Sequence, residues 1–252
     1  MEAKVSGEEV VIVTGAARGI GRAYALALAG AGYRVMVADL LDGAPVVQDA
    51  AEAGGTAAAV TVDVQDRGST EAMVRATLER FGRVDVLINN AAYFTAIHKK
   101  PFDELTDEEW DRAFAVNVRG SWLCAVAAAA PMKRQRSGKI INTSSMVVPS
   151  GIPFFLHYLA SKAAVIGLTR GLARELGDYG ITVNTISPDY IPHDAEYAGR
   201  QPEMAGLLAA GRCIKRDSMP EDLIGTIMYL VGHGSDFVTG QNILVNGGRI
   251  FS

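Results

Sequence analysis

Three polar residues, Ser145, Tyr158 and Lys162, have types and a spacing that suit proton transfer to or from a carbinol oxygen. Tyr158 and Lys162 are four positions apart, so in a helix their side chains stack on one face. A free phenol has a pKa of about 10 and is a poor base near neutral pH, but a nearby ammonium group favours the phenolate. Ser145 follows Lys139 to Thr143, an apolar run typical of a strand, and would lie at the carboxyl edge of a sheet. The pattern predicts that three side chains converge on one alcohol or carbonyl oxygen.

A glycine-rich turn near the N-terminus predicts a dinucleotide site. The apolar run Val10 to Thr14 is typical of a buried strand, and Gly-x3-Gly-x-Gly at 15–21 opens a helical run from Arg22 to Ala31. Glycines at such a turn permit close approach of the backbone to a pyrophosphate, which the N-terminus of a helix attracts. A second strand ends at Asp39, where a carboxylate can accept hydrogen bonds from an adenosine ribose.

Apolar runs typical of strands alternate with helical patterns along the chain. This alternation predicts an α/β fold with a doubly wound, seven-stranded parallel sheet flanked by helices, in a single domain over residues 1–252. Thr106-x-x-Glu109 predicts a capping box, and Pro220 predicts the first turn of another helix. The least regular stretch, about 188–219, is the expected substrate loop, either a surface helix or a lid. The expected strands are Val10 to Thr14, Arg34 to Ala38, Ala57 to Thr61, Val84 to Ile88, Lys139 to Thr143, Thr182 to Ile186 and Asn242 to Val245.

The composition is typical of a globular chain in water. Of 252 residues, 49% are hydrophobic and 21% are charged, which is ample for a buried core. The net charge of -4 gives no reason to expect nucleic acid or an anionic membrane as a partner, and the longest apolar runs are too short or too interrupted to span a bilayer. The two cysteines, Cys124 and Cys213, argue against a disulfide framework or a metal site. With no signal-peptide pattern, we expect a cytoplasmic protein.

These motifs occur together in the order and spacing of a known family. The chain resembles the short-chain dehydrogenases/reductases over almost its whole length, and the resemblance implies a Rossmann-like fold, a nicotinamide cofactor and oxidoreductase activity. It also implies a homotetramer, with the helices from Asp107 to Ala130 and from Tyr158 to Gly177 at one interface. The matching motifs are Thr14-Gly-x3-Gly-x-Gly21, Asp63-Val64, Asn89-Asn-Ala91, Asn117, Ser145, Tyr158-x3-Lys162, Asn184, Val238-Thr-Gly240 and Asn246-Gly-Gly248.

The resemblance implies a role for each residue of the catalytic set. Tyr158 would be the general acid/base, and Ser145 would orient the substrate oxygen. Lys162 would lower the pKa of the phenol and bind the nicotinamide ribose. Asn117 would hold a helix break and a water molecule of a proton relay. Ser144 also precedes Tyr158 closely, but the thirteen-residue offset of the family selects Ser145.

Asp39 is the basis for expecting NAD as the cofactor. Its carboxylate would bind the two ribose hydroxyls of NAD and repel the 2′-phosphate of NADP. Arg18 lies in the glycine turn and could contact a phosphate instead, which leaves NADP open. By resemblance, Asp63 would contact the adenine amine and Val64 would wall the ring. The expected cofactor-binding residues are Gly15, Arg18, Gly19, Ile20, Gly21, Asp39, Leu40, Asp63, Val64, Asn90, Ala91, Tyr158, Lys162, Pro188 and Ile191.

Four positions depart from the family pattern. Ala92 replaces a glycine, which is tolerable unless the position needs a positive φ. Asp189 and His193 replace a glycine and a threonine that border the nicotinamide carboxamide, so we expect them to bring a titrating group to that edge. Asn246 replaces an aspartate, which we interpret as a neutral structural change.

The substrate is expected to meet mostly apolar and aromatic side chains, with no cluster of arginines to receive a carboxylate or phosphate. This favours a neutral, largely apolar secondary alcohol and its ketone as the small-molecule substrate. The enzymatic alternative is a 3-oxoacyl-carrier-protein or acyl-CoA reductase, in which Lys133, Arg134 and Arg136 would meet an acidic carrier. The non-enzymatic alternative, an NAD(H)-binding redox sensor, is disfavoured by the complete catalytic set. The expected pocket residues are Tyr93, Phe94, Met146, Val147, Phe154, Phe155, Tyr190, Tyr197, Met204 and Leu207, with packing against the core as the alternative for Phe154 and Phe155.

Overall fold

The computed structural model describes residues 8–191 and 202–251, and its centre is one parallel sheet. The strand order is β3-β2-β1-β4-β5-β6-β7, which confirms the predicted seven-stranded, doubly wound sheet. Most strand ends lie within two residues of the expected ones. The strands are β1 (Val10–Thr14), β2 (Arg34–Asp39), β3 (Thr56–Thr61), β4 (Val86–Asn89), β5 (Gly138–Thr143), β6 (Ile181–Pro188) and β7 (Asn242–Val245).

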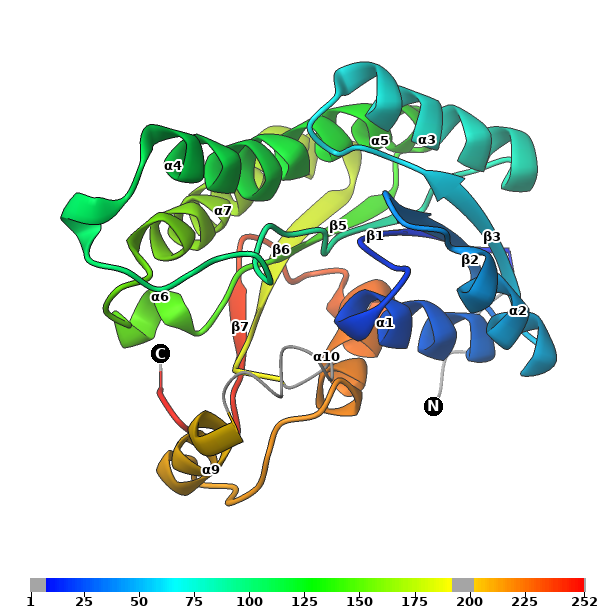
Figure 1. Ribbon diagram of the computed structural model, residues 1–252. Helices are drawn as coiled ribbons and strands as arrows, with labels where there is room; N and C mark the ends of the chain where they lie inside the picture. Colours follow the sequence, from blue (N-terminus) through cyan, green and yellow to red (C-terminus); the bar gives the residue numbers. More distant parts are fainter. Residues whose placement is uncertain (1–7, 192–201, 252) are drawn as a thin grey trace.

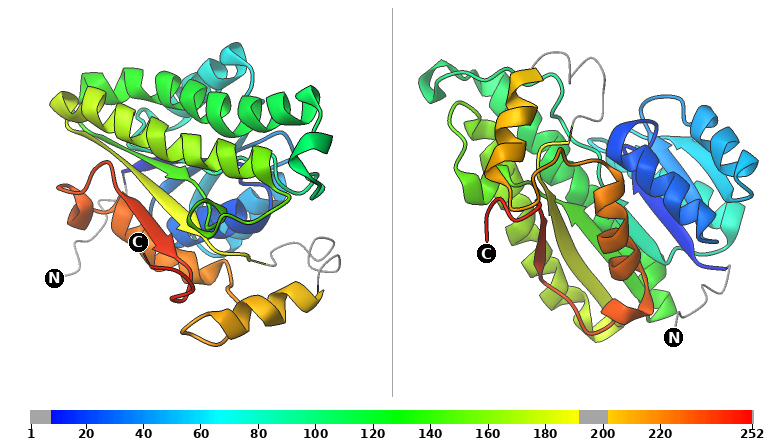
Figure 2. Two further views of the ribbon diagram at one scale, coloured as in Figure 1. Left: turned by 90° about the vertical axis from the view of Figure 1, so that its left-hand side faces the viewer. Right: turned by 90° about the horizontal axis from the view of Figure 1, so that it is seen from below.

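Helices cover both faces of the sheet (Figures 1 and 2). One face carries α3 (Arg67–Phe81), α4 (Asp107–Phe114), α5 (Ser121–Gln135) and α7 (Leu156–Leu176). The opposite face carries α1 (Gly19–Gly30), α2 (Ala44–Glu52) and α10 (Glu221–Val231). Because both faces are covered, the central strands are continuous apolar runs; the Val10–Val13 stretch of β1 is fully buried.

The ends of several helices follow from local chemistry. Thr106 and Glu109 form the predicted capping box at the start of α4. Pro220 is the N-cap of α10, so it starts this helix as predicted, and the helix ends at Val231. Between α4 and α5 the chain makes a π-helical turn, η2 (Ala115–Gly120), around Asn117, so the predicted helix break is confirmed.

The predicted substrate loop contains a helix, α9 (Pro202–Gly211), and its role as a lid stays a prediction. It lies at the same end of the sheet as the short helix α6 (Val147–Ser150) and the C-terminus (Figure 1). The loop after α9 is joined to the segment after β7 by a hydrogen bond from Ile214 N to Gly247 O. Short turns complete the described elements: η1 (Phe102–Glu104), η3 (Gly177–Tyr179) and η4 (His233–Ser235).

Candidate active site

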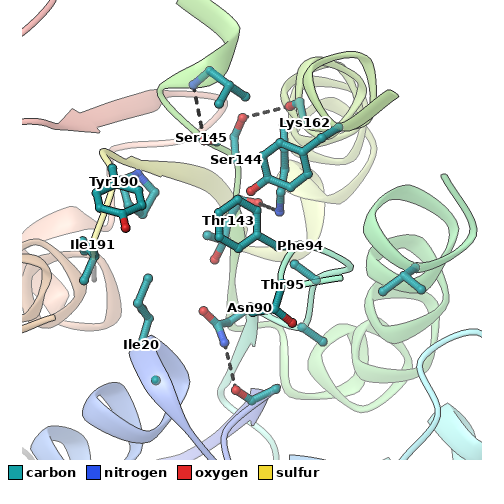
Figure 3. Close-up of a pocket in the computed structure, with 18 of the residues that line it drawn as sticks. Ile20, Asn90, Phe94, Thr95, Thr143, Ser144, Ser145, Lys162, Tyr190 and Ile191 are labelled. Carbon is teal, nitrogen blue, oxygen red and sulfur yellow. Dashed lines mark hydrogen bonds between the residues drawn. The ribbon is translucent and has the colours of Figure 1, made fainter. Parts of the chain in front are cut away.

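A cavity of about 710 Å³ lies at the carboxyl ends of the strands, where the strand order reverses between β1 and β4. Open α/β sheets bind their ligands in the crevice at this point. Figure 3 shows Ser145, Thr143 and Lys162 on one side of this space, with Ile20 and Asn90 on the side of the glycine turn. The two groups that the sequence singled out therefore share one cavity.

Tyr158 and Lys162 lie one turn apart on α7 and both line the cavity. Their exposed fractions are 6% and 2%. The Lys162 ammonium donates a hydrogen bond to Thr143 O at 2.8 Å and lies 5.6 Å from the centre of the Tyr158 ring. Burial lowers the pKa of Lys162 to about 7, because desolvation penalises the charged amine. Protonated Lys162 is therefore a cation that can be titrated near neutral pH, within reach of the phenol.

The two adjacent serines have different partners. The hydroxyl of Ser144 is buried and donates to Lys162 O at 2.8 Å, which ties β5 to α7. The Ser145 hydroxyl faces the cavity and accepts a long 3.3 Å hydrogen bond from Val147 N. The geometry supports Ser145, and not Ser144, as the serine available to a substrate oxygen.

Asn117 lies behind the cavity wall and not in it. Its side-chain oxygen accepts from Tyr93 N at 2.8 Å, and its amide donates to Ser161 Oγ at 2.9 Å. The amide therefore fixes the π-helical turn against α7 and the strand-end loop that carries Tyr93. Its part in a proton relay stays a prediction.

The glycine turn is locked to the end of β4 by two polar side chains. Thr14 Oγ1 accepts from Asn90 N and Ala91 N, and the Asn90 amide donates to Thr14 O and Gly15 O. Gly15 has φ +65°, and a Cβ there would lie 2.7 Å from Ala91 Cα. A Cβ on Gly21 would collide with Gly15 O, so Gly21 closes the turn from behind and is absent from the cavity wall.

Asp39 stands at the end of β2 and lines the cavity. Its carboxylate accepts from Ala17 N at 2.9 Å and from Leu41 N at 3.0 Å, so it is held in position between the glycine turn and the next loop. Asp63 also lines the cavity, with Gln65 N and Nε2 donating to one of its carboxylate oxygens.

This end of the cavity fits a dinucleotide. The N-terminus of α1 opens directly onto it, because Gly15, Gly19 and Ile20 are part of the wall and leave the backbone N–H groups accessible. Ala17 N donates a hydrogen bond to the carboxylate of Asp39, which is 22 residues further along the chain. This bond places a carboxylate suited to bind a ribose beside the turn suited to bind phosphate. Of the expected cofactor residues, only Gly21 is not at the wall.

The other end of the cavity is aromatic and apolar. Phe94 and Phe155 pack against Tyr158, with ring centres 5.1 and 4.9 Å from that of the phenol. Met146, Val147, Phe154 and Tyr190 also line it, as the sequence predicted.

Some pocket predictions do not hold. The Tyr93 ring turns away and lies under the guanidinium of Arg112, 5.1 Å from its centre. Leu207 is 70% exposed, and its neighbour Leu208 lines the cavity instead, because only one side of α9 faces inward. Tyr197 and His193 lie outside the described residues.

Comparison with known proteins agrees with this geometry. Residues 15–249 match the family model described as enoyl-(acyl carrier protein) reductase. The chain is 38% identical over 240 residues to the 3-oxoacyl-(acyl-carrier-protein) reductase FabG of Staphylococcus aureus, covering 94% of this chain and 96% of the relative. It is 36% identical over 255 residues to galactitol 2-dehydrogenase of Agrobacterium fabrum, covering 97% and 98%. A solved short-chain type dehydrogenase/reductase from Mycobacterium ulcerans superposes with a TM-score of 0.90 at 28% identity, covering 96% of this chain and 90% of that one.

The chain belongs to the short-chain dehydrogenase/reductase family. The predicted resemblance is confirmed, and the protein is an oxidoreductase of a family that typically uses a nicotinamide cofactor, NAD or NADP. Within the described residues, one helical stretch, Asp107–Gln135, is long and apolar enough to cross a membrane, contrary to expectation. However, 56% of its most apolar window is buried, and it packs against α3 and α7 as a core helix.

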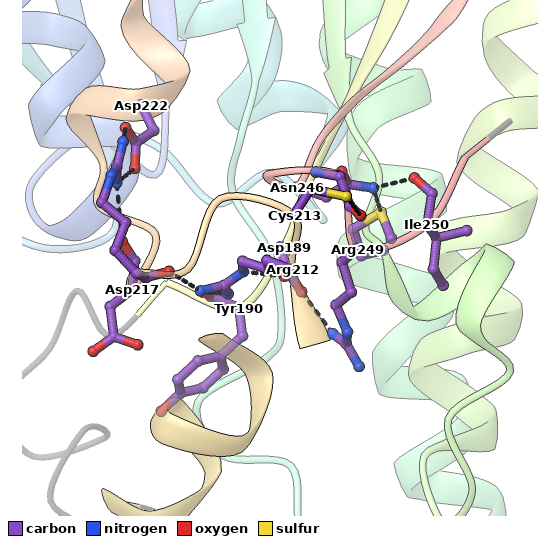
Figure 4. Close-up of polar contacts among 12 residues, drawn as sticks. Asp189, Tyr190, Arg212, Cys213, Asp217, Asp222, Asn246, Arg249 and Ile250 are labelled. Atoms are coloured by element: carbon purple, nitrogen blue, oxygen red, sulfur yellow. Dashed lines mark hydrogen bonds and ion pairs between the residues drawn. The ribbon is translucent and has the colours of Figure 1, made fainter. Parts of the chain in front are cut away.

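The departures from the pattern of this family gain a physical explanation. Ala92 needs no glycine, since Arg136 and Phe154 are the only non-glycine residues with positive φ in the described part of the chain. Asp189 lines the cavity, but its carboxylate is 1% exposed and accepts from Arg212 Nε at 2.8 Å and Arg249 Nη1 at 2.7 Å (Figure 4). Asp189 is therefore a member of a buried ion cluster, and the expectation for His193 stays a prediction because that residue lies outside the described ones.

Two further interpretations need correction. Asn246 is not a neutral replacement, because its amide donates to Ile250 O at 2.7 Å, which an aspartate carboxylate cannot do. The mostly apolar lining expected from the sequence also needs an addition, because Arg249 and Lys99 line the cavity, although a single added arginine is not the cluster of arginines whose absence is predicted. Sequence reasoning missed Arg249 because nothing local marks it; the only signal was its position beside the departing Asn246-Gly-Gly248 motif.

Proposed function

We propose that the protein is an NAD-dependent dehydrogenase that interconverts a secondary alcohol and its ketone, with Tyr158 as general acid/base. The observation that carries the proposal is the single cavity that joins the glycine turn, Asp39, Ser145, Tyr158 and Lys162. The glycine turn and Asp39 would hold a nicotinamide dinucleotide, which would supply the acceptor or donor of the hydride exchanged with the carbinol carbon.

The side chains of the chain itself handle the proton. Ser145 donates a hydrogen bond to the carbinol oxygen and positions it against Tyr158. Tyr158 takes the hydroxyl proton as the alcohol becomes a ketone and returns it in reduction, so no charge is stranded on the substrate oxygen. Protonated Lys162, held by Thr143 O, favours the phenolate that this step requires. The apolar walls around the phenol exclude water and strengthen this interaction.

Asp39 supports NAD over NADP. Because its carboxylate is fixed by Ala17 N and Leu41 N, it cannot swing away from a 2′-phosphate without losing both hydrogen bonds. Arg18, which also lines the cavity, would favour the phosphate. We assign greater weight to Asp39, since a fixed carboxylate repels a nearby phosphate strongly in a partly desolvated site.

The aromatic end of the cavity favours a substrate with apolar groups beside the carbinol carbon. Phe94, Phe155 and Met146 would remove such groups from water at about 25 cal/mol per Å². The substrate can also carry a charged group, since Arg249 lines the cavity.

A second candidate is reduction of a 3-oxoacyl thioester, the activity named for the Staphylococcus aureus relative. The predicted docking residues do not favour it. Lys133 and Arg134 end α5 and Arg136 follows it, all before β5 begins at Gly138, so they lie at the amino edge of the sheet. Ser145 follows the carboxyl end of β5, about 20 Å away for a six-residue strand. Lys133 and Arg136 also lie over the Tyr179 ring.

We propose that the surface of α4, α5 and α7 is an interface of a homotetramer, and that the protein is cytoplasmic. Trp110 and Trp122 are 38% and 39% exposed there. Trp122, Phe114 and Leu168 line a shallow groove on the same face. Exposed aromatic residues around a groove are typical of an interface.

The test of the proposed function is NAD reduction with a panel of secondary alcohols, run beside a 3-hydroxyacyl thioester. We expect turnover of aryl or alicyclic secondary alcohols with NAD. Binding of NADH without turnover of any alcohol or thioester would indicate a sensor, and a clear preference for the thioester would indicate the second candidate.

A further inference from the structure

Asp189, Arg212 and Arg249 form an ion cluster where three distant segments meet (Figure 4). Asp189 follows β6, Arg212 follows α9, and Arg249 lies beyond β7. Each carboxylate oxygen of Asp189 accepts from a different guanidinium. The cluster therefore carries two cations and one anion, an excess of one positive charge.

The two arginines have different surroundings. Arg212 is 2% exposed and donates to Asp189, to Arg216 O at 2.7 Å and to Tyr190 O at 3.2 Å, so all three of its nitrogens are engaged. Arg249 is 19% exposed and lines the cavity. Among the described residues, Asp189 is the hydrogen-bond partner recorded for Arg249, through Nη1 alone. The excess charge and the unengaged donors thus belong to Arg249.

The backbone that carries Arg249 is fixed. The Asn246 amide donates to Ile250 O, and its oxygen accepts from Gly248 N, so the loop closes around Arg249. A Cβ on Gly248 would lie 2.9 Å from Cys213 Sγ, and one on Gly247 would lie 3.2 Å from Arg212 Cδ, so the loop packs tightly on the segment after α9. A guanidinium held this way loses little freedom when a ligand binds.

Arg249 shares its one counter-ion, Asp189, with Arg212. Keeping such a guanidinium in a largely apolar cavity costs free energy unless an anion completes its hydrogen bonds. We propose that Arg249 is a specificity-determining residue that binds a carboxylate of the substrate, at the end of the substrate remote from the carbinol carbon. The inference rests on the proposed function, because it concerns the same cavity. The substrate is then an amphiphilic hydroxy acid or oxo acid: its apolar part meets Phe155 and Met146, and its carboxylate meets Arg249.

The test compares oxo acids with their uncharged counterparts. The probes are 4-oxopentanoate and 5-oxohexanoate, each against its primary amide, which keeps the shape and removes the charge. Reduction by NADH gives kcat and KM, and the thermal shift of the enzyme–NADH complex gives binding without turnover. We expect at least one acid to exceed its amide about tenfold in kcat/KM and to bind more tightly.

Three variants identify the residue responsible. Arg249→Met should raise KM for the acids about tenfold, with kcat, KM for the amides and NADH affinity each within about threefold of wild type. Arg249→Lys should be intermediate, because one charge remains but the planar fork is lost. Lys215→Met is the control: it removes one charge from an exposed position in the segment after α9, outside the cavity wall, and it should change KM by less than about twofold.

The outcomes separate the inference from the proposed function. Amides that bind and react as well as the acids would overturn the inference while leaving the dehydrogenase intact. A loss of NADH affinity in Arg249→Met would also overturn it, by making Arg249 a cofactor residue. Thermal shifts by the acids, lost in Arg249→Met, would support it even if no probe were reduced, a result that would count against the proposed function alone.

Discussion

The two ends of the cavity are held together in different ways. At the cofactor end, short polar side chains fix the backbone: Thr14 and Asn90 hold the glycine turn against the end of β4 through neutral hydrogen bonds. At the substrate end, a buried ion cluster around Asp189 joins segments that are 23 and 60 residues apart. The first end depends on neutral hydrogen bonds and on two glycines that leave room for the backbone, and the second depends on charge.

This difference teaches where each end can vary. A glycine turn tolerates almost no added atom, since both Gly15 and Gly21 face backbone. An ion cluster can be replaced by other side chains of suitable volume, although removal of one member leaves a buried charge. Relatives with different substrates can therefore share the cofactor end and differ at the substrate end.

The largest predicted effect breaks the substrate end alone. Arg212→Met should lower the free energy of unfolding by about 3 kcal/mol, because Asp189 loses the buried one of its two guanidinium partners. Urea unfolding measures it, with NADH affinity expected to stay within about threefold. Arg216→Met is the control, since its ion pair with Asp222 is 56% exposed at the arginine and should matter little. Equal losses in both variants would show that the cluster carries no special stability.

A smaller effect breaks the cofactor end. Gly21→Ala should weaken NADH binding about thirtyfold, or about 2 kcal/mol, because the new Cβ displaces Gly15 O and distorts the turn. NADH fluorescence titration measures it. Gly30→Ala, in the same helix with no atom within 4 Å of the added Cβ, should bind NADH as wild type does. Unchanged binding in Gly21→Ala would contradict the role given to the turn.

The same contrast explains what the sequence could predict. The sheet, the capping box at Thr106, the break at Asn117 and the cavity lining near the glycines all follow from short motifs, because local backbone chemistry determines them. The predicted start of β4 at Val84 is two residues early, because Val84 is as buried as Val86 but lies outside the strand.

Short sequence motifs do not predict the side-chain contacts at the substrate end of the cavity. Asp189 stood out as a departure, yet its partners Arg212 and Arg249 could not be read from spacing, because only tertiary packing brings them together. The orientation of Tyr93 escaped prediction for the same reason: Arg112 and Asn117, both more than fifteen residues away, determine it.

Exchange of Asp39 sharpens the account of the cofactor end. Wild-type enzyme should prefer NAD to NADP by about tenfold or more in kcat/KM, or about 1.4 kcal/mol. Asp39→Ser should reduce that ratio, because the charge facing the 2′-phosphate is gone. Asp42→Ser removes an exposed carboxylate of the next loop and should leave the ratio unchanged. A wild-type preference for NADP would show that Arg18 outweighs Asp39.

Lys162 lies between the cofactor end and the substrate end of the cavity. Its replacement has the smallest predicted effect on the free energy of unfolding. Its pKa is lowered from 10.5 to about 7 in the folded protein, so between these values the unfolded chain binds more protons and stability rises with pH. Lys162→Met should lack this rise and should be about 1 kcal/mol more stable than wild type at pH 7 without cofactor, while losing activity. Thermal unfolding between pH 7 and 10 measures it. The same pH slope in both proteins would show that Lys162 stays charged when buried.

The proposed mechanism assigns proton transfer at the carbinol oxygen to Tyr158, and Tyr158→Phe tests this assignment most directly. The variant removes one oxygen and leaves the packing of Phe94 and Phe155 against the ring. With the best secondary alcohol and NAD, kcat should fall at least about a hundredfold while NADH affinity is retained. Tyr190→Phe, the same deletion elsewhere on the cavity wall, should stay within about fivefold of wild type. A Tyr158→Phe enzyme that kept a tenth of the wild-type kcat, about 1.4 kcal/mol in the barrier, would contradict the account.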